Sequence, residues 1–293
     1  GIRSLYIYSA LLLATNVNEV SYATTATPEK FWSKWTEQFA DKNAEELYRY
    51  KLAEKVNEKR INPKMFSERY SYVRTDIEKK YDAPLTPSVQ DAYIYNLCRP
   101  KRLLGLMYGF TLYDDGVKKV ARYQQLRAAN KIVDRVVESN EKQGVIWHTQ
   151  GSGKSLTILY TAYKLSRAEK LNDPTVYIVV DRKDLKDQLD DTFINCIFPN
   201  ARQVLSIGDL RNLIDNKPAG VYITTIQKFR ELGDIKDERE NVIVLIDEAH
   251  RTEYGDFQME LRAVLPNAQR FAFTGTPVPK THREFGVKRS DGK

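Results

Sequence analysis

One segment of the chain has residue types and spacing suited to holding phosphate: residues 148–155, with the sequence His-Thr-Gln-Gly-Ser-Gly-Lys-Ser. Gly151 and Gly153 allow backbone N–H groups to curl around phosphate oxygens, and the helix expected next adds the positive end of its dipole. Lys154 can reach the β- and γ-phosphates of a nucleotide, and the Ser155 hydroxyl can ligate Mg²⁺. We therefore predict a nucleotide-binding loop formed by Thr149, Gln150, Gly151, Ser152, Gly153, Lys154 and Ser155.

This loop departs from the strict phosphate-loop pattern at one position. The pattern has Gly six residues before the Lys, where this chain has His148. The alternative interpretation of the segment is a glycine-containing structural turn that happens to carry a surface lysine.

A second candidate segment is acidic and follows the apolar stretch 242–246. Asp247 is suited to holding Mg²⁺, directly or through water, and Glu248 to polarising an attacking water molecule. A pair of acidic residues after a strand is also common as a simple charge pair at a helix N-terminus. Its position about 95 residues after the phosphate loop, in the same predicted sheet, favours the catalytic interpretation.

A third segment, Thr-Gly-Thr-Pro at residues 274–277, directly follows another apolar stretch. The hydroxyls of Thr274 and Thr276 could bond the acidic loop and respond to the presence of a γ-phosphate. The alternative is a plain turn at the end of a strand, which this sequence also forms well.

These three segments each adjoin a short apolar stretch that must position them. From residue 120 onward such apolar stretches alternate with amphipathic helical stretches. The predicted strands are 145–148, 175–180, 203–207, 221–224, 242–246 and 270–274. The predicted helices are 123–138, 154–169, 184–194, 209–216 and 256–265. Near-continuous apolar strands joined by helices predict an α/β fold with a parallel sheet covered on both faces, and such sheets bind ligands at the carboxyl ends of their strands.

The first 115 residues have a different, mixed α+β pattern. We predict a hairpin from residues 5–14 and 20–25, and helices over 29–39 and 41–60, with Thr86 or Ser88 as the N-cap of a later helix. The sequence therefore predicts two regions, 1–115 and 116–293.

The composition is that of a globular protein, with 293 residues, 42% hydrophobic and 29% charged. It excludes disorder, a collagen repeat and a small disulfide scaffold, and the apolar run around residues 10–14 is far shorter than the ~20 residues that cross a bilayer. Two cysteines form neither a zinc site nor a disulfide framework, and no signal peptide is visible, so we expect a reducing, cytoplasmic location.

The net charge of +7 is unevenly distributed. Residues 1–143 carry 24 Lys and Arg against 18 Asp and Glu, whereas residues 144–293 carry 22 against 21. This excess is compatible with a polyanionic partner and equally with an ordinary solvated surface.

Taken in order, these motifs resemble those of superfamily 2 helicases and translocases. Residues 148–157, 181–185 (Asp-Arg-Lys-Asp-Leu), 247–251 (Asp-Glu-Ala-His-Arg) and 271–277 more specifically resemble the restriction (R) subunit of type I restriction-modification enzymes. The resemblance is strong over about 120–280 and weaker over 1–119. It implies a first RecA-like P-loop NTPase domain over 116–293, preceded over 1–115 by the C-terminal part of a nuclease domain and a linker.

The resemblance also implies an activity, cofactors and partners. That family's R subunit is an ATP-driven translocase on double-stranded DNA, uses ATP and Mg²⁺, and works with modification (methyltransferase) and specificity subunits. Gln125, or alternatively Gln124, matches the family's adenine-recognising Gln. The matching residues for coupling nucleotide state to DNA are His250, Thr274 and Thr276. Those matching the motifs along the DNA strand, where contacts go to phosphates, are Arg182, Gln188, Thr225 and Gln227.

The resemblance places the nuclease carboxylates before Gly1 and a second RecA-like domain, with its arginine finger, after residue 280. We therefore expect the chain to be an internal portion of a longer protein. Two alternatives stay open: another superfamily 2 enzyme, such as a remodeller-like translocase or an RNA helicase, and a non-catalytic assembly module.

Overall fold

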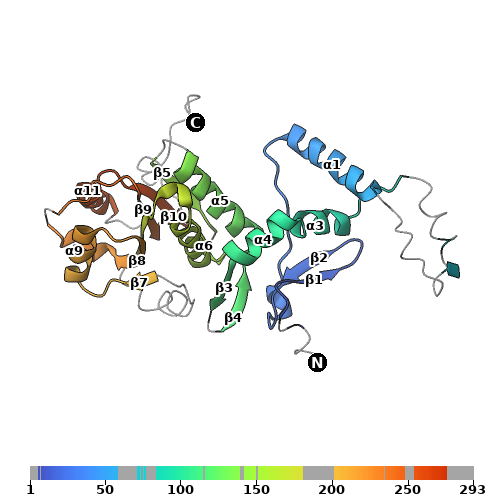
Figure 1. Ribbon diagram of the computed structural model, residues 1–293, viewed down its shortest axis with the longest axis horizontal. Helices are drawn as coiled ribbons and strands as arrows, with labels where there is room; N and C mark the ends of the chain where they lie inside the picture. Colours follow the sequence, from blue (N-terminus) through green and yellow to red (C-terminus); the bar gives the residue numbers. More distant parts are fainter. Residues whose placement is uncertain are drawn as a thin grey trace. The chain divides into compact units, whose positions relative to one another are not determined.

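The computed structural model describes residues 6, 8–58, 71, 72, 74, 76, 84–114, 116–138, 142–149, 151–180, 201–233, 235–247 and 254–275. The chain divides into two compact units, Gly1–Met107 and Tyr108–Lys293 (Figure 1). The division expected from the sequence, at residues 115 and 116, lies a few residues further on, within a hairpin of the second unit.

The second unit is built on a parallel sheet of six strands in the order β5-β10-β9-β6-β8-β7. The strands are β5 (Gln143–Trp147), β6 (Thr175–Val180), β7 (Ala201–Gln203), β8 (Gly220–Thr225), β9 (Val242–Asp247) and β10 (Gln269–Thr274). Every residue of β6 and β9 is buried, because these strands lie inside the sheet and are covered on both faces. The predicted α/β class with a parallel sheet is confirmed.

Helices cover both faces of this sheet. They are α5 (Tyr123–Glu138), α6 (Lys154–Ser166), η5 (a 3-10 turn, Glu169–Leu171), α9 (Ile207–Asn216), α10 (Ile226–Arg230) and α11 (Tyr254–Val264). Alternate residues such as Tyr177 and Val179 in β6 and Val244 in β9 join a core with α9, α10 and α11. The residues between them face the other way, toward α6, against which α5 packs.

Most predicted elements agree with the observed ones, and α5 and β6 have the predicted bounds. The strand predicted over 203–207 is wrong beyond its first residue, since β7 is Ala201–Gln203 and α9 begins at Ile207. The cause is a capping box at Ser206, whose hydroxyl accepts from the N–H of Asp209 while the Asp209 carboxylate accepts from the N–H of Ser206. The helix predicted over 184–194 lies outside the described residues.

A hairpin that the sequence analysis did not predict precedes α5. Its strands β3 (Thr111–Asp114) and β4 (Val117–Val120) are antiparallel. Gly116, in the turn, has φ +71°, a left-handed conformation that favours glycine. The Phe110 carbonyl accepts from the N–H of Ala121, which closes the base of the hairpin just before α5.

The first unit consists of a short hairpin and helices. Its elements are β1 (Leu12–Thr15), β2 (Val20–Ala23), η2 (a 3-10 turn, Glu29–Phe31), α1 (Lys42–Asn57), α3 (Val89–Leu97) and α4 (Pro100–Gly109), whose last residues extend into the second unit. The predicted hairpin is confirmed, although its first strand is Leu12–Thr15 and not 5–14, and the helix predicted over 41–60 is confirmed over Lys42–Asn57. Ser88 is the N-cap of α3, forming a capping box with Asp91.

The helix predicted over 29–39 is wrong, because only Glu29–Phe31 forms one 3-10 turn. The backbone of Ser33 instead pairs with Tyr22 of β2, with both N···O distances 2.9 Å. The indole of Trp35, 2% exposed, packs 5.8 Å from the Tyr22 ring. Ser33 and Trp35 thus cover β2 instead of forming part of a helix.

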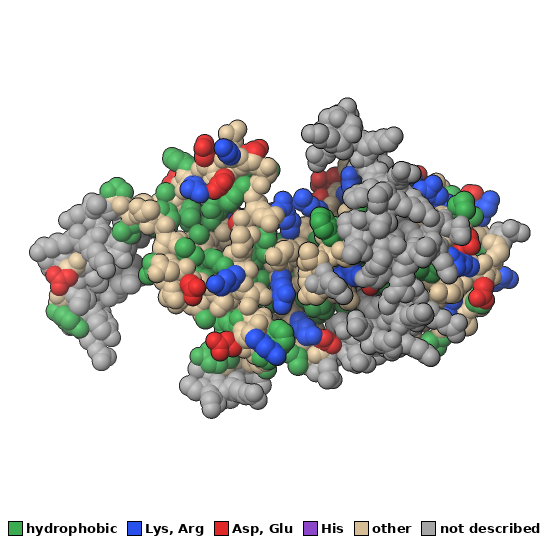
Figure 2. All heavy atoms as spheres, turned by 180° about the vertical axis from the view of Figure 1, so that it is seen from behind, with side chains coloured by type: hydrophobic (Ala, Val, Ile, Leu, Met, Phe, Trp, Pro, Cys, Tyr) green, Lys and Arg blue, Asp and Glu red, His purple; other side chains and the backbone are tan. Residues whose placement is uncertain are grey.

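Charged side chains of both signs occupy the surface. Figure 2 shows Lys and Arg side chains scattered over the described part of one face, with Asp and Glu between them. In the part of the chain that the structure describes, no helix has the length and apolar character to cross a membrane.

Candidate functional site

The phosphate loop lies where predicted, between the end of β5 and the start of α6. Gly151 and Gly153 have φ +77° and +79°, so both residues need the freedom of glycine. A Cβ at Gly153 would lie 2.4 Å from Nε2 of Gln125, which independently requires glycine there. The N–H of Ser152 donates to the Thr149 carbonyl at 3.1 Å, which curls the loop toward the N-terminus of α6. Gln150 lies outside the described residues.

Gln125, the predicted adenine-recognising residue, is buried in α5 and contacts the phosphate loop. Its Nε2 donates to the carbonyls of Ser152 at 3.3 Å and Gly153 at 3.1 Å. Its Oε1 accepts from the N–H of Arg122 at 2.9 Å. Gln125 therefore fixes the position of the loop, and adenine recognition stays a prediction. Gln124, the alternative, is exposed.

Lys154 and Asp247 meet at the carboxyl edge of the sheet. Their side chains form an ion pair of 3.0 Å between Nζ and Oδ1 and are 16% and 5% exposed. The sheet order explains the meeting, because β10 separates β5 from β9 and aligns Phe273 with Asp247 and Thr274 with Trp147. Residues far apart in the sequence, one cationic and one acidic, are thus brought to one place beside the phosphate loop.

The exit of β10 contacts the phosphate loop directly. The Thr274 carbonyl accepts from the N–H of His148 at 2.9 Å, and the Gly275 carbonyl accepts from the Trp147 indole Nε1 at 3.1 Å. Thr274 is fully buried. A shift of this strand end would therefore move the loop. Coupling between nucleotide state and DNA requires a connection of this kind, and the coupling role of Thr274 stays a prediction.

Several further predicted site residues lie outside the described residues. Those site residues are Arg182, Gln188, Glu248, His250 and Thr276. Thr225 is the buried last residue of β8 and precedes α10, and Gln227 is half-buried in α10. Both lie at the carboxyl end of β8, and their role in DNA binding stays a prediction.

His148 is the site residue whose role the sequence analysis missed. It is 6% exposed; its Nδ1 lies 2.7 Å from Oγ of Ser152 and its Nε2 3.3 Å from Oγ1 of Thr157. Burial, and then the positive charge of Lys154, lower the pKa of His148 below its ordinary value of 6.5. The signal was visible in the sequence, since His148 is the departure from the phosphate-loop pattern.

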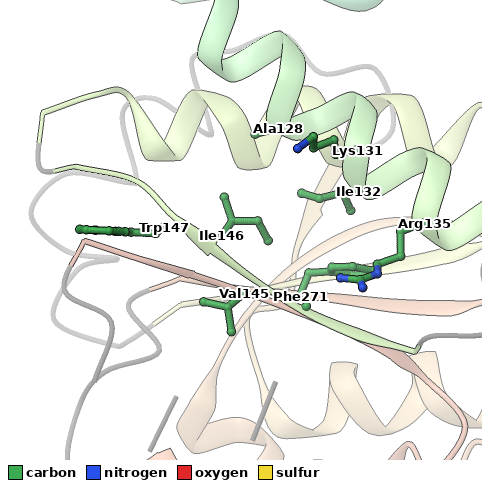
Figure 3. Close-up of a pocket in the computed structure, with 9 residues that line it drawn as sticks. Ala128, Lys131, Ile132, Arg135, Val145, Ile146, Trp147 and Phe271 are labelled. Carbon is green, nitrogen blue, oxygen red and sulfur yellow. The ribbon is translucent and has the colours of Figure 1, made fainter. Parts of the chain in front are cut away.

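A separate cavity of about 270 Å³ lies between α5 and β5, which is at one end of the strand order. Figure 3 shows Lys131 and Arg135 extending from α5, with Val145 and Phe271 below them and Trp147 further along β5. Of the predicted site residues that the structure describes, none lines this cavity, so it is distinct from the phosphate loop.

A parallel sheet with a glycine-containing loop between its first strand and a helix, and a buried Asp at the end of a nearby strand beside the loop's Lys, defines a P-loop ATPase domain of the RecA-like class. The family model described as SWI2/SNF2 ATPase matches residues 124–289. This match covers more than half of the chain, and the chain belongs to that family.

Curated relatives point to one kind of enzyme. The chain is 38% identical over 213 residues to the type I restriction enzyme HindI endonuclease subunit of Haemophilus influenzae, covering 62% of this chain and 20% of that protein. It is 36% identical over 203 residues to a Methanocaldococcus jannaschii protein provisionally named the endonuclease subunit of type I restriction enzyme MjaIXP, covering 64% and 19%. The resemblance to type I restriction subunits is confirmed, and the chain spans about one fifth of the length of these relatives.

A solved structure with a similar arrangement is the Sulfolobus solfataricus SWI2/SNF2 ATPase core in complex with double-stranded DNA. It shares 15% identity and a TM-score of 0.43, over 59% of this chain and 34% of that one.

Proposed function

We propose that this chain is the ATP-binding part of a double-stranded DNA translocase, within the endonuclease subunit of a type I restriction enzyme. The observation that carries the proposal is the pairing of Lys154 with Asp247 beside a loop with two left-handed glycines. In this proposal residues 1–115 correspond to the end of a nuclease domain and a linker. A type I restriction enzyme acts on DNA inside the cell, so we propose a cytoplasmic location.

Each loop residue has a defined role in binding ATP. Backbone N–H groups of Thr149, Gln150, Gly151 and Gly153 surround the phosphates, together with those at the start of α6. The Ser152 N–H, which donates to the Thr149 carbonyl, keeps the loop curved around them. The Lys154 ammonium, now held by Asp247, is attracted by the β- and γ-phosphates, which carry more negative charge than one carboxylate. Gln125 selects adenine only by exchanging one of its present hydrogen bonds for the base.

The residues around Asp247 fit a divalent cation. This carboxylate is 5% exposed and is paired with Lys154 at 3.0 Å. When the phosphates attract Lys154 away, the buried carboxylate is left in need of another cation, which a divalent ion supplies. Ser155, half-buried in the first turn of α6, supplies a hydroxyl oxygen, a ligand type that Mg²⁺ accepts. We propose that Ser155 and Asp247 hold Mg²⁺, which would neutralise charge on the phosphates when bound.

Hydrolysis then requires a positioned water. We propose that Glu248 accepts a hydrogen bond from this water and orients it in line with the β–γ bond, while Lys154 neutralises the charge that develops on the phosphate. Thr274, His250 and Thr276 couple the nucleotide state to DNA, and Arg182, Gln188, Thr225 and Gln227 contact DNA phosphates. The arginine finger comes from a second RecA-like domain, and modification and specificity subunits complete the enzyme.

The experiment measures ATP hydrolysis by the full-length subunit with its partner subunits, with duplex DNA, with RNA and with neither. We expect stimulation by duplex DNA of unrelated sequences and loss of activity in Lys154→Ala. Stimulation by RNA alone would favour an RNA helicase. Absence of any ATP binding by the wild-type enzyme would favour a non-catalytic assembly module.

A further inference from the structure

His148 stands where the general phosphate-loop pattern has glycine, yet its side chain is inside the protein and makes contacts on both sides. Nδ1 lies 2.7 Å from the hydroxyl of Ser152, in the loop. Nε2 lies 3.3 Å from the hydroxyl of Thr157, in the first turns of α6. The ring therefore links the middle of the loop to the helix that follows it.

The neighbouring hydrogen bonds determine which ring nitrogen carries the proton. The Ser152 hydroxyl donates to the Thr149 carbonyl at 2.5 Å, so its hydrogen is used and Nδ1–H must be the donor to Ser152. The Gly153 carbonyl already accepts from the N–H of Thr157 and from Nε2 of Gln125. The Thr157 hydroxyl lies 3.2 Å from that carbonyl, to which it can donate, and 3.3 Å from Nε2 of His148. Because the carbonyl already has two donors and the unprotonated Nε2 still needs one, the hydroxyl hydrogen is better used by His148.

Ser152 is consequently held from two directions. Its hydroxyl accepts from His148, at the end of β5, and its carbonyl accepts from Gln125, in α5. The backbone of His148 is in turn tied to the Thr274 carbonyl. The curve of the loop is therefore determined by side chains from outside it, and its two glycines alone do not fix it.

We infer that His148 is a positioning residue of the nucleotide site: its neutral ring joins Ser152 to Thr157 and keeps the loop in the form that receives phosphate. This inference rests on the proposed ATP site and adds a residue that touches no reacting atom. It carries a counterintuitive consequence, because replacing His148 by glycine restores the general pattern and yet should weaken nucleotide binding.

The test measures ATP hydrolysis by the full-length enzyme, with its partner subunits and duplex DNA, for the wild type, His148→Gly and His148→Asn. In His148→Gly we expect KM for ATP to rise about tenfold, the effect of losing two modest hydrogen bonds, with kcat at saturating ATP retained. His148→Asn keeps an amide N–H for Ser152 and should recover part of the loss. Loss of folded protein alone would lower kcat and leave KM unchanged.

A second variant keeps the inference testable if His148→Gly does not fold. Ser152→Ala removes the hydroxyl that His148 contacts, and we expect it to raise KM. Adding His148→Asn to it should raise KM by less than the product of the single effects, because His148→Asn weakens the same contact that Ser152→Ala removes. Wild-type KM in His148→Gly, or in Ser152→Ala, would overturn the inference. A wild-type KM in Lys154→Ala would instead overturn the proposed ATP site itself.

Discussion

The two units of this chain obtain their structure in different ways. In Tyr108–Lys293 the central strands β6 and β9 are buried along their whole length and apolar except for Thr175 at the start of β6 and Asp247 at the end of β9. In Gly1–Met107 the strands β1 and β2 have four residues each. The core of this unit is therefore formed by contacts between a few large side chains. The Trp35 ring, for example, lies against Tyr22 and also beneath the Arg102 guanidinium, at 5.2 Å.

This difference explains where the chemistry is concentrated. In the parallel sheet the carboxyl ends of β5, β9 and β10 lie at one edge. Residues that follow these strands are therefore close together although they are distant in sequence. In the first unit two of the described arginines are held by other side chains of that unit: Arg102 pairs with Glu37 at 3.5 Å, and Arg99 stacks on Tyr95 at 4.8 Å. We therefore assign the nucleotide site wholly to the second unit.

The largest effect is expected from Glu248→Gln in the full-length enzyme. The amide keeps the shape of the side chain and cannot accept a proton from water, so hydrolysis should fall by about 10²–10⁴-fold while ATP still binds. Rapid-quench hydrolysis and equilibrium ATP binding measure the two effects separately. Normal hydrolysis by this variant would show that another group orients the water.

Trp35→Ala tests the separation of the two units. Removing a buried indole should lower the free energy of unfolding by about 3–5 kcal/mol in the first unit. The affinity for Mg-ATP should be unchanged, because the phosphate loop belongs to the second unit. Denaturant unfolding followed by nucleotide titration measures both, and Leu13→Ala, at a more exposed position of the same unit, is the control. Weakened ATP binding by folded Trp35→Ala would contradict the separation.

A smaller effect concerns DNA and the basic excess of the first 143 residues. We expect sequence-independent binding in the range of about 10⁻⁴–10⁻⁶ M that weakens with salt. Lys101 is exposed, and Lys101→Ala should reduce the slope of log affinity against log salt by about 0.9, the value for one phosphate contact. Titrations of unrelated labelled duplexes at several salt concentrations measure this, with Lys42→Ala as the control. Sequence-selective, salt-insensitive binding would favour a recognition module instead.

The smallest predicted effect is on pH-dependent stability. Because the pKa of His148 is lowered in the folded chain, the unfolded chain binds more protons below about pH 6.5, its ordinary pKa. Stability from the neutral ring is thus complete above that pH and is lost as pH falls toward the folded pKa. Urea unfolding of the wild type at pH 8 and pH 5.5 should show a larger loss than in His148→Asn. Equal losses would show that the ring is not buried in its neutral form.

Much of the second unit was predictable from the sequence, because strand burial and helical periodicity dominate there. The bounds of β6 and α5, the loop containing Lys154 and the position of Asp247 followed from local pattern. The ion pair between Lys154 and Asp247 depends on strand order, which local pattern does not give. The contacts of Gln125 with the loop backbone were likewise hidden, since a buried and an exposed Gln look alike in sequence.

The errors share a physical cause, which is that a nearby contact overrode a local preference. Residues 29–39 have helical spacing, but Ser33 pairs with β2 and Trp35 packs on Tyr22. Residues 203–207 contain Val204, Leu205 and Ile207, but the Ser206 capping box begins a helix. In the sequence His148 was only a departure from the phosphate-loop pattern. Its contacts with Ser152 and Thr157 became visible only in the folded structure.

The central claim is that the loop at the end of β5 binds ATP through Lys154. Isothermal titration of this chain with Mg-ATP tests it most directly, alongside Lys154→Ala and the exposed-lysine control Lys170→Ala. We expect saturable binding at one site by the wild type and Lys170→Ala, and loss of binding in Lys154→Ala. Equal binding by Lys154→Ala and the wild type would contradict it.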